Sequence, residues 1–271
     1  MIHVRNLTPS NLDDVFKVCS ATMPDDAVRD QGRALKRQWL TSMMQAYGPC
    51  TKLAYWGTTP IAQLLYYPER AVPFRRAVRP DVLRLHCLYS PFASSHRRGA
   101  ATALLQALLQ KCQTGCSTFD GRIPAFISAR RMDSPEGEGL HRLYQKCGFQ
   151  EMEQEYVLEL HGTYSPRPPS DAHPCSGEPG QVLLFYDACC EWSWRFALGA
   201  QHRLRDMGVE RAVTLLNSWD CPDLFSAYGE HMVVVNGVGV KTFWRDTDRF
   251  HQEVLEACAT PPRRLNSGDS P

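Results

Sequence analysis

The sequence predicts an α/β protein built from two domains, and three observations lead to this prediction. Its 271 residues exceed one average domain and fall short of three. Short strand-like and longer helix-like hydrophobic patterns alternate along most of the chain. A stretch with five prolines interrupts both patterns, and such a stretch neither continues a helix nor fills a central strand. We therefore expect a first domain at 1–160, a linker at 161–180, a second domain at 181–258 and a flexible tail at 259–271.

The composition excludes several classes of protein. Hydrophobic residues make up 43% and charged residues 22% of the chain, a balance that is not typical of disordered or fibrous proteins. The formal net charge of +1 gives no global basic field, so we expect no nucleic-acid partner. No apolar run approaches the roughly 18 residues that a membrane helix needs. We expect a cytoplasmic protein without a membrane partner, and no pattern indicates an oligomeric state.

The cysteines do not follow a structural or metal-binding pattern. The eleven cysteines lack the regular spacing of small disulfide-stapled domains. No C-x-x-C occurs, and the close pairs Cys112/Cys116 and Cys189/Cys190 lack histidines at zinc-finger spacing. We therefore expect mostly reduced thiols and no metal site.

In the first domain, apolar residues with a period of two predict strands and those with a period of 3.6 predict helices. The expected strands are 2–7, 51–56, 60–67, 82–89, 123–128 and 157–160. The expected helices are 11–21, 31–47, 99–112 and 139–147. Gly148 takes the C-cap position of the last helix. The resulting order is β-α-α-β-β-β-α-β-α-β.

The fourth expected strand leads through a turn of small residues into a helix N-terminus. At Gly99, Ala100 and Ala101 no bulky side chain would keep a phosphate from the free backbone amides and the positive end of the helix dipole. Arg97 and Arg98 add positive charge at the same place. The pattern favours a pyrophosphate site. The alternative is that the small residues only let the helix pack on the sheet.

Two short segments of the first domain resemble sequence motifs of a known protein family. The first is His96-Arg97-Arg98-Gly99-Ala100-Ala101, and the second is Leu143-Tyr144-Gln145-Lys146-Cys147-Gly148-Phe149. With the element order, they resemble the loop Q/R-x-x-G-x-G/A and the helix motif L-Y-x-K-x-G-F of the GNAT superfamily of acetyl-CoA-dependent acyltransferases. The resemblance covers residues 2–160, and His96 departs from it at the first loop position.

The resemblance implies a GNAT acyltransferase fold with a mixed central sheet, and acetyl-CoA as co-substrate. It implies main-chain pairing of Leu88, Tyr89 and Ser90 with the pantetheine arm, where their strand splays from its neighbour. It also implies that Tyr144 protonates the leaving thiolate, a role that suits a phenol because its proton stays on at neutral pH. The alternative for Tyr144 is an aromatic side chain packed on the sheet.

The sequence does not decide whether the reaction uses a general base, or what the basic loop before the fourth strand binds. His86 lies on the strand that should flank the acyl group, and a neutral imidazole can accept the ammonium proton. Direct attack by an amine, with its proton leaving through water, needs no such base. Arg70, Arg75, Arg76 and Arg79 form a basic loop before this strand, which would meet a 3′-phosphate, an acidic substrate or only solvent.

The second domain has the expected order β-α-β-α-β-β-α. The expected strands are 182–186 and 212–216, followed by a hairpin at 232–240 that turns at Asn236-Gly237. The expected helices are 193–207, 222–228 and 246–257. This order suits a thioredoxin-like fold.

Cys190 lies where the first strand of this domain leads into a helix, and the helix dipole and free amides there favour a thiolate. With Ser193 it forms C-x-x-S, which resembles the monothiol variant of the thioredoxin and glutaredoxin active site. Cys189 and Cys221 are the candidate resolving thiols. The proline expected just before Val233 is missing. The alternative is a thioredoxin-like binding module whose cysteines are packing residues.

The combination of domains resembles bacterial acetyltransferases with a YoaP-like C-terminal domain. The sequence therefore predicts an N-acetyltransferase that moves an acetyl group from acetyl-CoA to an amine of a small molecule or protein. Tyr144, His86 and Cys190 are its candidate catalytic residues. One alternative is a thiol-redox or metal-handling protein that acts through Cys190 while the first domain senses acyl-CoA. The other is a noncatalytic interaction protein.

Overall fold

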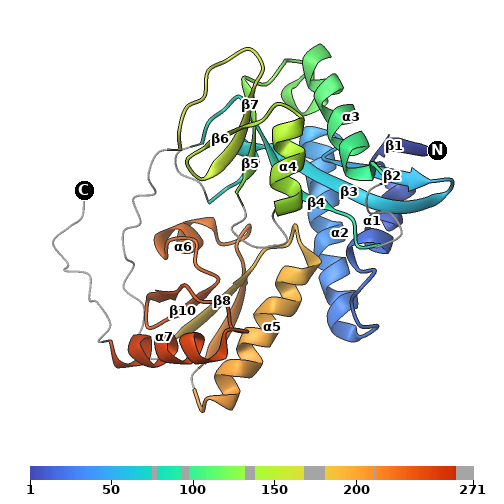
Figure 1. Cartoon of the computed structure of the whole chain (residues 1–271). Coiled ribbons are helices and arrows are strands. Elements are labelled where there is room, and N and C mark those ends of the chain that lie inside the picture. Colours follow the sequence, from blue (N-terminus) through green and yellow to red (C-terminus); the bar gives the residue numbers. More distant parts are fainter. Residues whose placement is uncertain (75–77, 93–97, 132–137, 168–180, 210–211, 261–271) are drawn as a thin grey trace. The chain divides into compact units, whose positions relative to one another are not determined.

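The computed structural model describes residues 1–74, 78–92, 98–131, 138–167, 181–209 and 212–260 (Figure 1). These residues form two compact units. Unit 1 comprises 1–25, 37–72 and the described residues from 78 to 167. Unit 2 comprises 26–36, 73–74 and the described residues after 180, so two short segments of the N-terminal half belong to it. None of the described helices is both long and apolar enough to cross a membrane.

Unit 1 is built on a mixed seven-stranded sheet with the order β1-β2-β3-β4-β5-β7-β6 (Figure 1). Its strands are β1 (Ile2–Asn6), β2 (Thr51–Trp56), β3 (Thr59–Pro68), β4 (Val82–Tyr89), β5 (Phe126–Arg130), β6 (Gln150–Met152) and β7 (Glu155–Glu159). Its helices are α1 (Leu12–Cys19), the part of α2 (Ala27–Tyr47) from residue 37 onward, α3 (Ala100–Thr114) and α4 (Glu138–Lys146). The β4–β5 pair is parallel and the other neighbouring pairs are antiparallel.

The elements of unit 1 follow the predicted order with one addition. The single expected strand at 157–160 is the second arm of a hairpin, because β6 precedes β7 and pairs with it. The turn between them places Glu153 at φ +51°, in the left-handed region that glycine or asparagine normally occupies. Because no glycine or asparagine stands at this position, the pattern does not predict the hairpin. The expected strand at 123–128 is shifted to Phe126–Arg130.

The two faces of the unit 1 sheet are covered by different helices. The apolar side of α3, with Leu104, Leu105 and Leu108, shares one buried core with Leu64 and Tyr66 of β3. Since successive strand residues point to opposite faces, Tyr67 points away from α3. Its ring instead contacts the Trp39 ring of α2 edge-on, with 5.8 Å between centroids. One face of the sheet therefore carries α3 and the other carries α2.

Unit 2 has a four-stranded sheet with the order β11-β10-β8-β9 (Figure 1). Its elements are β8 (Val182–Tyr186), α5 (Glu191–Asp206), β9 (Val213–Asn217), α6 (Pro222–Ala227), β10 (Val233–Val235), β11 (Val238–Val240) and α7 (Thr247–Ala259). β8 and β9 are parallel, and β10 is antiparallel to β8 and to β11. The hairpin turns at Asn236 and Gly237, both with positive φ, as the Asn-Gly pair predicts.

The beginning of the expected linker is packed on unit 1. The backbone amides of Leu160, His161 and Gly162 all donate to the carbonyl of Ala125. The His161 Nδ1 lies 3.0 Å from the carbonyl oxygen of Pro124. Residues 161–167 thus belong to unit 1, whereas 168–180 lie outside the described residues.

Candidate functional site

β4 and β5 separate in the middle of the sheet of unit 1. Their parallel pairing runs from Val82–Phe126 to Leu85–Ala129 and ends there. From residue 87 to 89, β4 pairs with β3 and with no other described strand, while β5 continues beside β7. One backbone edge of β4 is therefore open to a ligand along the residues 88 and 89 that the sequence predicts for cofactor binding. Ser90 follows directly, and its hydroxyl donates to the Ile61 carbonyl at 3.2 Å.

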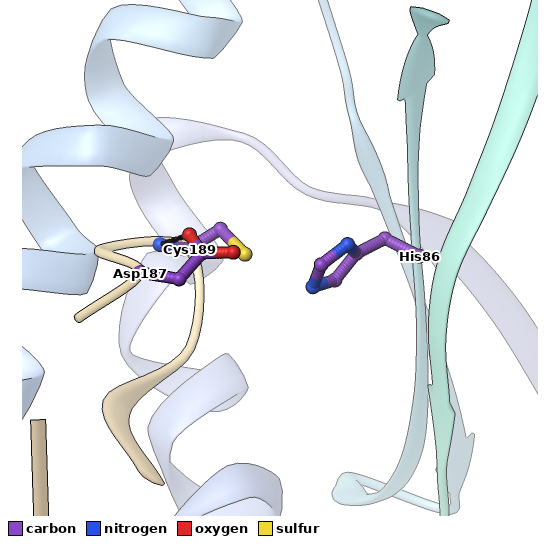
Figure 2. A group of neighbouring side chains, drawn as sticks. All are labelled: His86, Asp187 and Cys189. Atoms are coloured by element: carbon purple, nitrogen blue, oxygen red, sulfur yellow. Dashed lines mark hydrogen bonds between the residues drawn. The ribbon is translucent and has the colours of Figure 1, made fainter. Parts of the chain in front are cut away.

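A β-bulge lies at the point where the two strands separate. Leu65 of β3 pairs with Cys87, whereas the next residue, Tyr66, pairs with Leu85. His86 is therefore one extra residue in β4, and such an insertion bends a strand and redirects its side chains. Figure 2 draws the imidazole of His86 on its strand.

The His86 side chain lies on the α2 face of the sheet. Its Nδ1 is 2.7 Å from the Tyr67 hydroxyl oxygen, and the two ring centroids are 5.5 Å apart. If the Tyr67 hydroxyl accepts the Nδ1 hydrogen, Nε2 carries the lone pair and can accept a proton. The pair therefore provides a way to orient the imidazole as a base.

Tyr144 lies on the opposite face, within the core shared with α3. It is only 5% exposed, and its ring centroid is 5.3 Å from that of Phe149 and 5.7 Å from that of Tyr156. Gly148, at φ +89°, ends α4 and lets the Phe149 amide donate back to the Tyr144 carbonyl. Burial raises the pKa of the Tyr144 phenol above its ordinary value. The side chain is thus a fully protonated phenol at neutral pH.

The N-terminus of α3 exposes backbone amides. Gly99 caps the helix at φ +83°, and the place where a Cβ would stand is open space. The helix begins with the Ala103 amide donating to the Gly99 carbonyl at 2.8 Å, which leaves the amides of residues 100–102 without an intrahelical acceptor. Ala100 is buried and Ala101 is half-buried. Free amides at a helix N-terminus can bind an anion, and the pyrophosphate site stays a prediction.

The charged residues beside this helix end are only partly described. The Arg98 guanidinium lies over the exposed ring of Trp56, 4.9 Å from its centroid. Arg98 itself is exposed, so its charge remains accessible to an anion. His96 and Arg97, both part of the predicted loop, lie outside the described residues.

The basic loop before β4 differs from the expectation. Arg79 is 6% exposed and donates to both Glu69 and Glu155, at 2.7 Å and 2.8 Å for the shortest contacts. It is a structural ion-pair residue and does not face a phosphate, because two carboxylates already occupy its guanidinium. Arg70 contacts the Thr118 carbonyl and the Phe119 ring. Arg75 and Arg76 lie outside the described residues.

In unit 2, Cys190 is the N-cap of α5. Its carbonyl accepts the Ser193 amide at 2.9 Å, and the Ser193 hydroxyl accepts the Asp187 amide at 2.8 Å. The Cys189 amide donates to the Asp187 carboxylate at 2.9 Å, the contact dashed in Figure 2. The expectation of a lowered pKa at Cys190 is not met. Burial raises the pKa of the Cys190 thiol, and this effect outweighs the Lys36 charge and the amides of the first helical turn.

Two features of the site are not predictable from the sequence pattern. The bulge at His86 follows no glycine or proline that would mark it. In the sequence, Tyr67 is indistinguishable from the other apolar residues of its strand. Its hydroxyl becomes relevant only because the bulge brings His86 beside it. A strand alignment of β3 with β4 that allowed one insertion would have found both.

No family model and no curated protein matches this chain. Solved structures do match. The chain resembles the ribosomal-protein-S18-alanine N-acetyltransferase of Escherichia coli at 14% identity, over 61% of this chain and 97% of that one, with a TM-score of 0.40. It resembles an acetyltransferase of the GNAT family from Bacillus cereus at 13% identity, over 58% and 94% of the two chains, with a TM-score of 0.41. It resembles an N-acetyltransferase of Staphylococcus aureus Mu50 at 14% identity, over 59% and 99%, with a TM-score of 0.41. At these values the function has to be argued from the residues of this chain.

Proposed function

We propose that this protein is an acetyl-CoA-dependent N-acetyltransferase of the GNAT type, which transfers an acetyl group to an amine of a small molecule or protein. The observation that carries the proposal is the end of β4–β5 pairing at Leu85, on the strand that leads to the α3 N-terminus. Carboxyl ends of parallel strands are the usual place for ligands in such sheets. The open β4 edge suits an amide-bearing arm, and the free amides of α3 suit a pyrophosphate.

The two candidate proton-transfer groups lie on opposite faces of the sheet. In acyl transfer from a thioester to an amine, a C–N bond forms, the C–S bond breaks, the nitrogen loses a proton and the sulfur gains one. His86, oriented by Tyr67, supports proton removal on the α2 face. Tyr144 supports proton delivery to sulfur on the α3 face. Bringing the amine and thioester together supplies much of the rate, so few side chains are required.

For unit 2 we propose a thioredoxin-like domain of the YoaP type that binds a partner or substrate. The support is its β-α-β-α-β-β-α order, with the sheet order β11-β10-β8-β9 and one parallel pair. The raised pKa of the Cys190 thiol favours binding over thiol-redox catalysis, which needs a thiolate.

Titration of acetyl-CoA into the full chain tests the phosphate site at Gly99. Gly99→Asn keeps the left-handed backbone, which asparagine tolerates, but places a side chain in the open space over the α3 amides. We expect acetyl-CoA to bind the parent and to bind the variant about tenfold or more weakly, the loss of about 1.4 kcal/mol. Calorimetry measures both.

The matched control is Gly208→Asn in unit 2, because Gly208 also has positive φ, +69°, and open space at its Cβ. It should leave acetyl-CoA binding unchanged. Equal binding by the parent and Gly99→Asn would remove the α3 amides from the site. An absence of binding to the parent would overturn the acetyltransferase proposal.

Alkylation of Cys190 tests the role of unit 2. Burial raises the pKa of the Cys190 thiol, so the thiol is expected to be protonated at pH 7. We expect iodoacetamide to modify Cys190 more slowly than it modifies glutathione at pH 7, with a rate that climbs only at a higher pH than the rate for glutathione. Mass spectrometry of the Cys190 peptide, with Cys190→Ser to identify the signal, gives the rate. Fast modification at pH 7 would instead support the thiol-redox alternative.

A further inference from the structure

Arg84 is a half-buried arginine of β4 whose hydrogen-bond donors are not all used. Its strand neighbours Leu83 and Leu85 belong to the core shared with α3. Because successive strand residues point to opposite faces, the Arg84 side chain lies on the α2 face, where His86 also lies. The Nε and Nη1 atoms of Arg84 are buried and donate to no acceptor in the described part of the chain. Buried donors of a charged group are normally hydrogen-bonded, so this guanidinium calls for an acceptor that the described chain does not supply.

The neighbours of Arg84 in the sheet carry no negative charge. Arg84 pairs with Tyr67 of β3 on one side and with Ser128 of β5 on the other. Neighbouring strands are about 4.8 Å apart, and paired residues lie on the same face. Ser128 is 0% exposed, and its hydroxyl has no hydrogen-bond partner among the described residues either. An anion at Arg84 would thus find a guanidinium and a second donor on the adjacent strand.

The buried carboxylates that the structure describes in unit 1 already have cationic partners. They are Glu69 and Glu155, and Arg79 forms an ion pair with each of them. Arg167 forms ion pairs with the same two carboxylates. Across the described residues, no carboxylate forms an ion pair with Arg84. The charge of Arg84 is therefore available to an anion from outside the chain.

Arg84 lies close to the place where β4 and β5 separate. The pair Arg84–Ser128 is the last but one of their parallel pairing, which ends at Leu85–Ala129. Tyr67 pairs with Arg84, and its hydroxyl oxygen is 2.7 Å from the Nδ1 of His86. Arg84 and His86 are both partly exposed, and two residues of a strand span about 7 Å. One small molecule can therefore contact both side chains.

We propose that Arg84 binds the carboxylate of the acyl acceptor, which is a small amino acid whose amino group lies at His86. The inference rests on the proposed acetyl transfer. A carboxylate fits because its single negative charge balances one guanidinium, whereas the second charge of a phosphate would have no cation. In the reaction the neutral amine forms the C–N bond, its proton leaves through His86, the C–S bond breaks and the sulfur gains a proton. The carboxylate stays paired with Arg84 throughout.

Acetylation of paired amines by the full chain tests the carboxylate. Each pair consists of an amino acid and its primary amide, and the pairs cover the natural L-amino acids and β-alanine. We expect kcat/KM for at least one amino acid to exceed that for its amide by about 10–100-fold, the usual effect of hydrogen bonds to a charged group. Release of free CoA measures the rates.

Arg84→Met removes the guanidinium and keeps an unbranched apolar side chain. It should lower kcat/KM for the amino acid by about 10–100-fold, mainly through KM, and leave the amide unchanged. Intrinsic differences in reactivity between amino acid and amide cancel in this comparison. Arg84→Lys keeps the charge and should keep part of the preference. Because the buried donors of Arg84 have no partner, Arg84→Met should melt no lower than the parent. Arg122→Met changes an arginine of unit 1 that is 59% exposed and should keep the full preference.

Calorimetric titration of the same amines, with and without CoA, separates this inference from the proposed function, because binding needs no turnover. An amino acid that binds the parent and not Arg84→Met supports the carboxylate site even if no acetyl transfer follows. Equal acetylation of amino acids and amides would overturn the inference and leave the acetyltransferase standing. So would the same preference in the parent and in Arg84→Met. Failure of every amino acid to bind the parent would overturn the carboxylate site itself.

Discussion

Tyr144→Phe is expected to lower the rate of acetyl transfer by about 10²–10⁴-fold, the usual contribution of a general acid. The variant keeps the ring, which packs against Phe149 and Tyr156, and loses only the hydroxyl proton. Burial raises the pKa of this phenol, so the proton is present throughout the neutral range. Steady-state release of free CoA, measured with a thiol reagent and an amine acceptor from a screen, gives the rate. Acetyl-CoA binding and the melting temperature should stay at parent values.

Tyr156→Phe is the matched control for this experiment. Tyr156 is also buried and its ring contacts that of Tyr144, but its hydroxyl donates to Glu151 at 3.1 Å. Its removal should leave the rate within about twofold of the parent, since surface-directed groups of this kind contribute little to a reaction elsewhere. Unchanged turnover in Tyr144→Phe would remove Tyr144 from the mechanism. A parallel loss of acetyl-CoA binding would reassign it to positioning.

Arg79→Met should destabilise unit 1 by about 3 kcal/mol, because it removes the more deeply buried of the two arginines that pair with Glu69 and Glu155 and leaves Arg167 as their remaining partner. Arg79 donates to Glu69 and Glu155, and also to the Ser165 carbonyl at 2.8 Å, so one guanidinium connects three segments far apart in sequence. The two carboxylates raise the pKa of Arg79 against the effect of burial. The melting temperature should fall by about 10 °C. Calorimetry or circular dichroism measures it.

Arg122→Met provides the comparison for an exposed pair. The Arg122 guanidinium lies 3.3 Å from Asp81, and both side chains are about half exposed, at 59% and 46%. Such a pair contributes little, so the change should stay within about 0.5 kcal/mol. Adding Glu69→Gln to Arg79→Met should recover part of the lost stability, because a single remaining carboxylate, Glu155, then faces the single remaining arginine, Arg167. A loss below about 1 kcal/mol in Arg79→Met would contradict the role of Arg79 as the centre of the network.

The regular elements of this protein are predictable because each depends on neighbours in sequence. The period of Leu104, Leu105 and Leu108 predicts α3, and the structure buries these residues against the sheet. The Asn236-Gly237 pair predicts the hairpin of unit 2, and both residues adopt positive φ. The open end of α3 is predictable for the same reason, because it depends only on the small size of Gly99 and on its position between β4 and α3.

The features that escaped prediction depend on residues far apart in the chain. Arg79 reads as one arginine of a basic loop, and its burial follows only from Glu155, 76 residues away. The pKa of Cys190 depends on how deeply its helix end is buried, which the C-x-x-S spacing does not contain.

The extra residue in β4 should make the fold tolerant of one particular deletion, that of residue 86. Deleting a residue from a strand normally turns every following side chain to the wrong face. Here Cys87 already pairs with Leu65, and Leu85 with Tyr66, so loss of codon 86 would leave the pairing on both sides in place. Such a deletion would remove the imidazole and spare the sheet. A lineage of this protein could therefore lose its candidate base in one mutational event and keep a folded descendant.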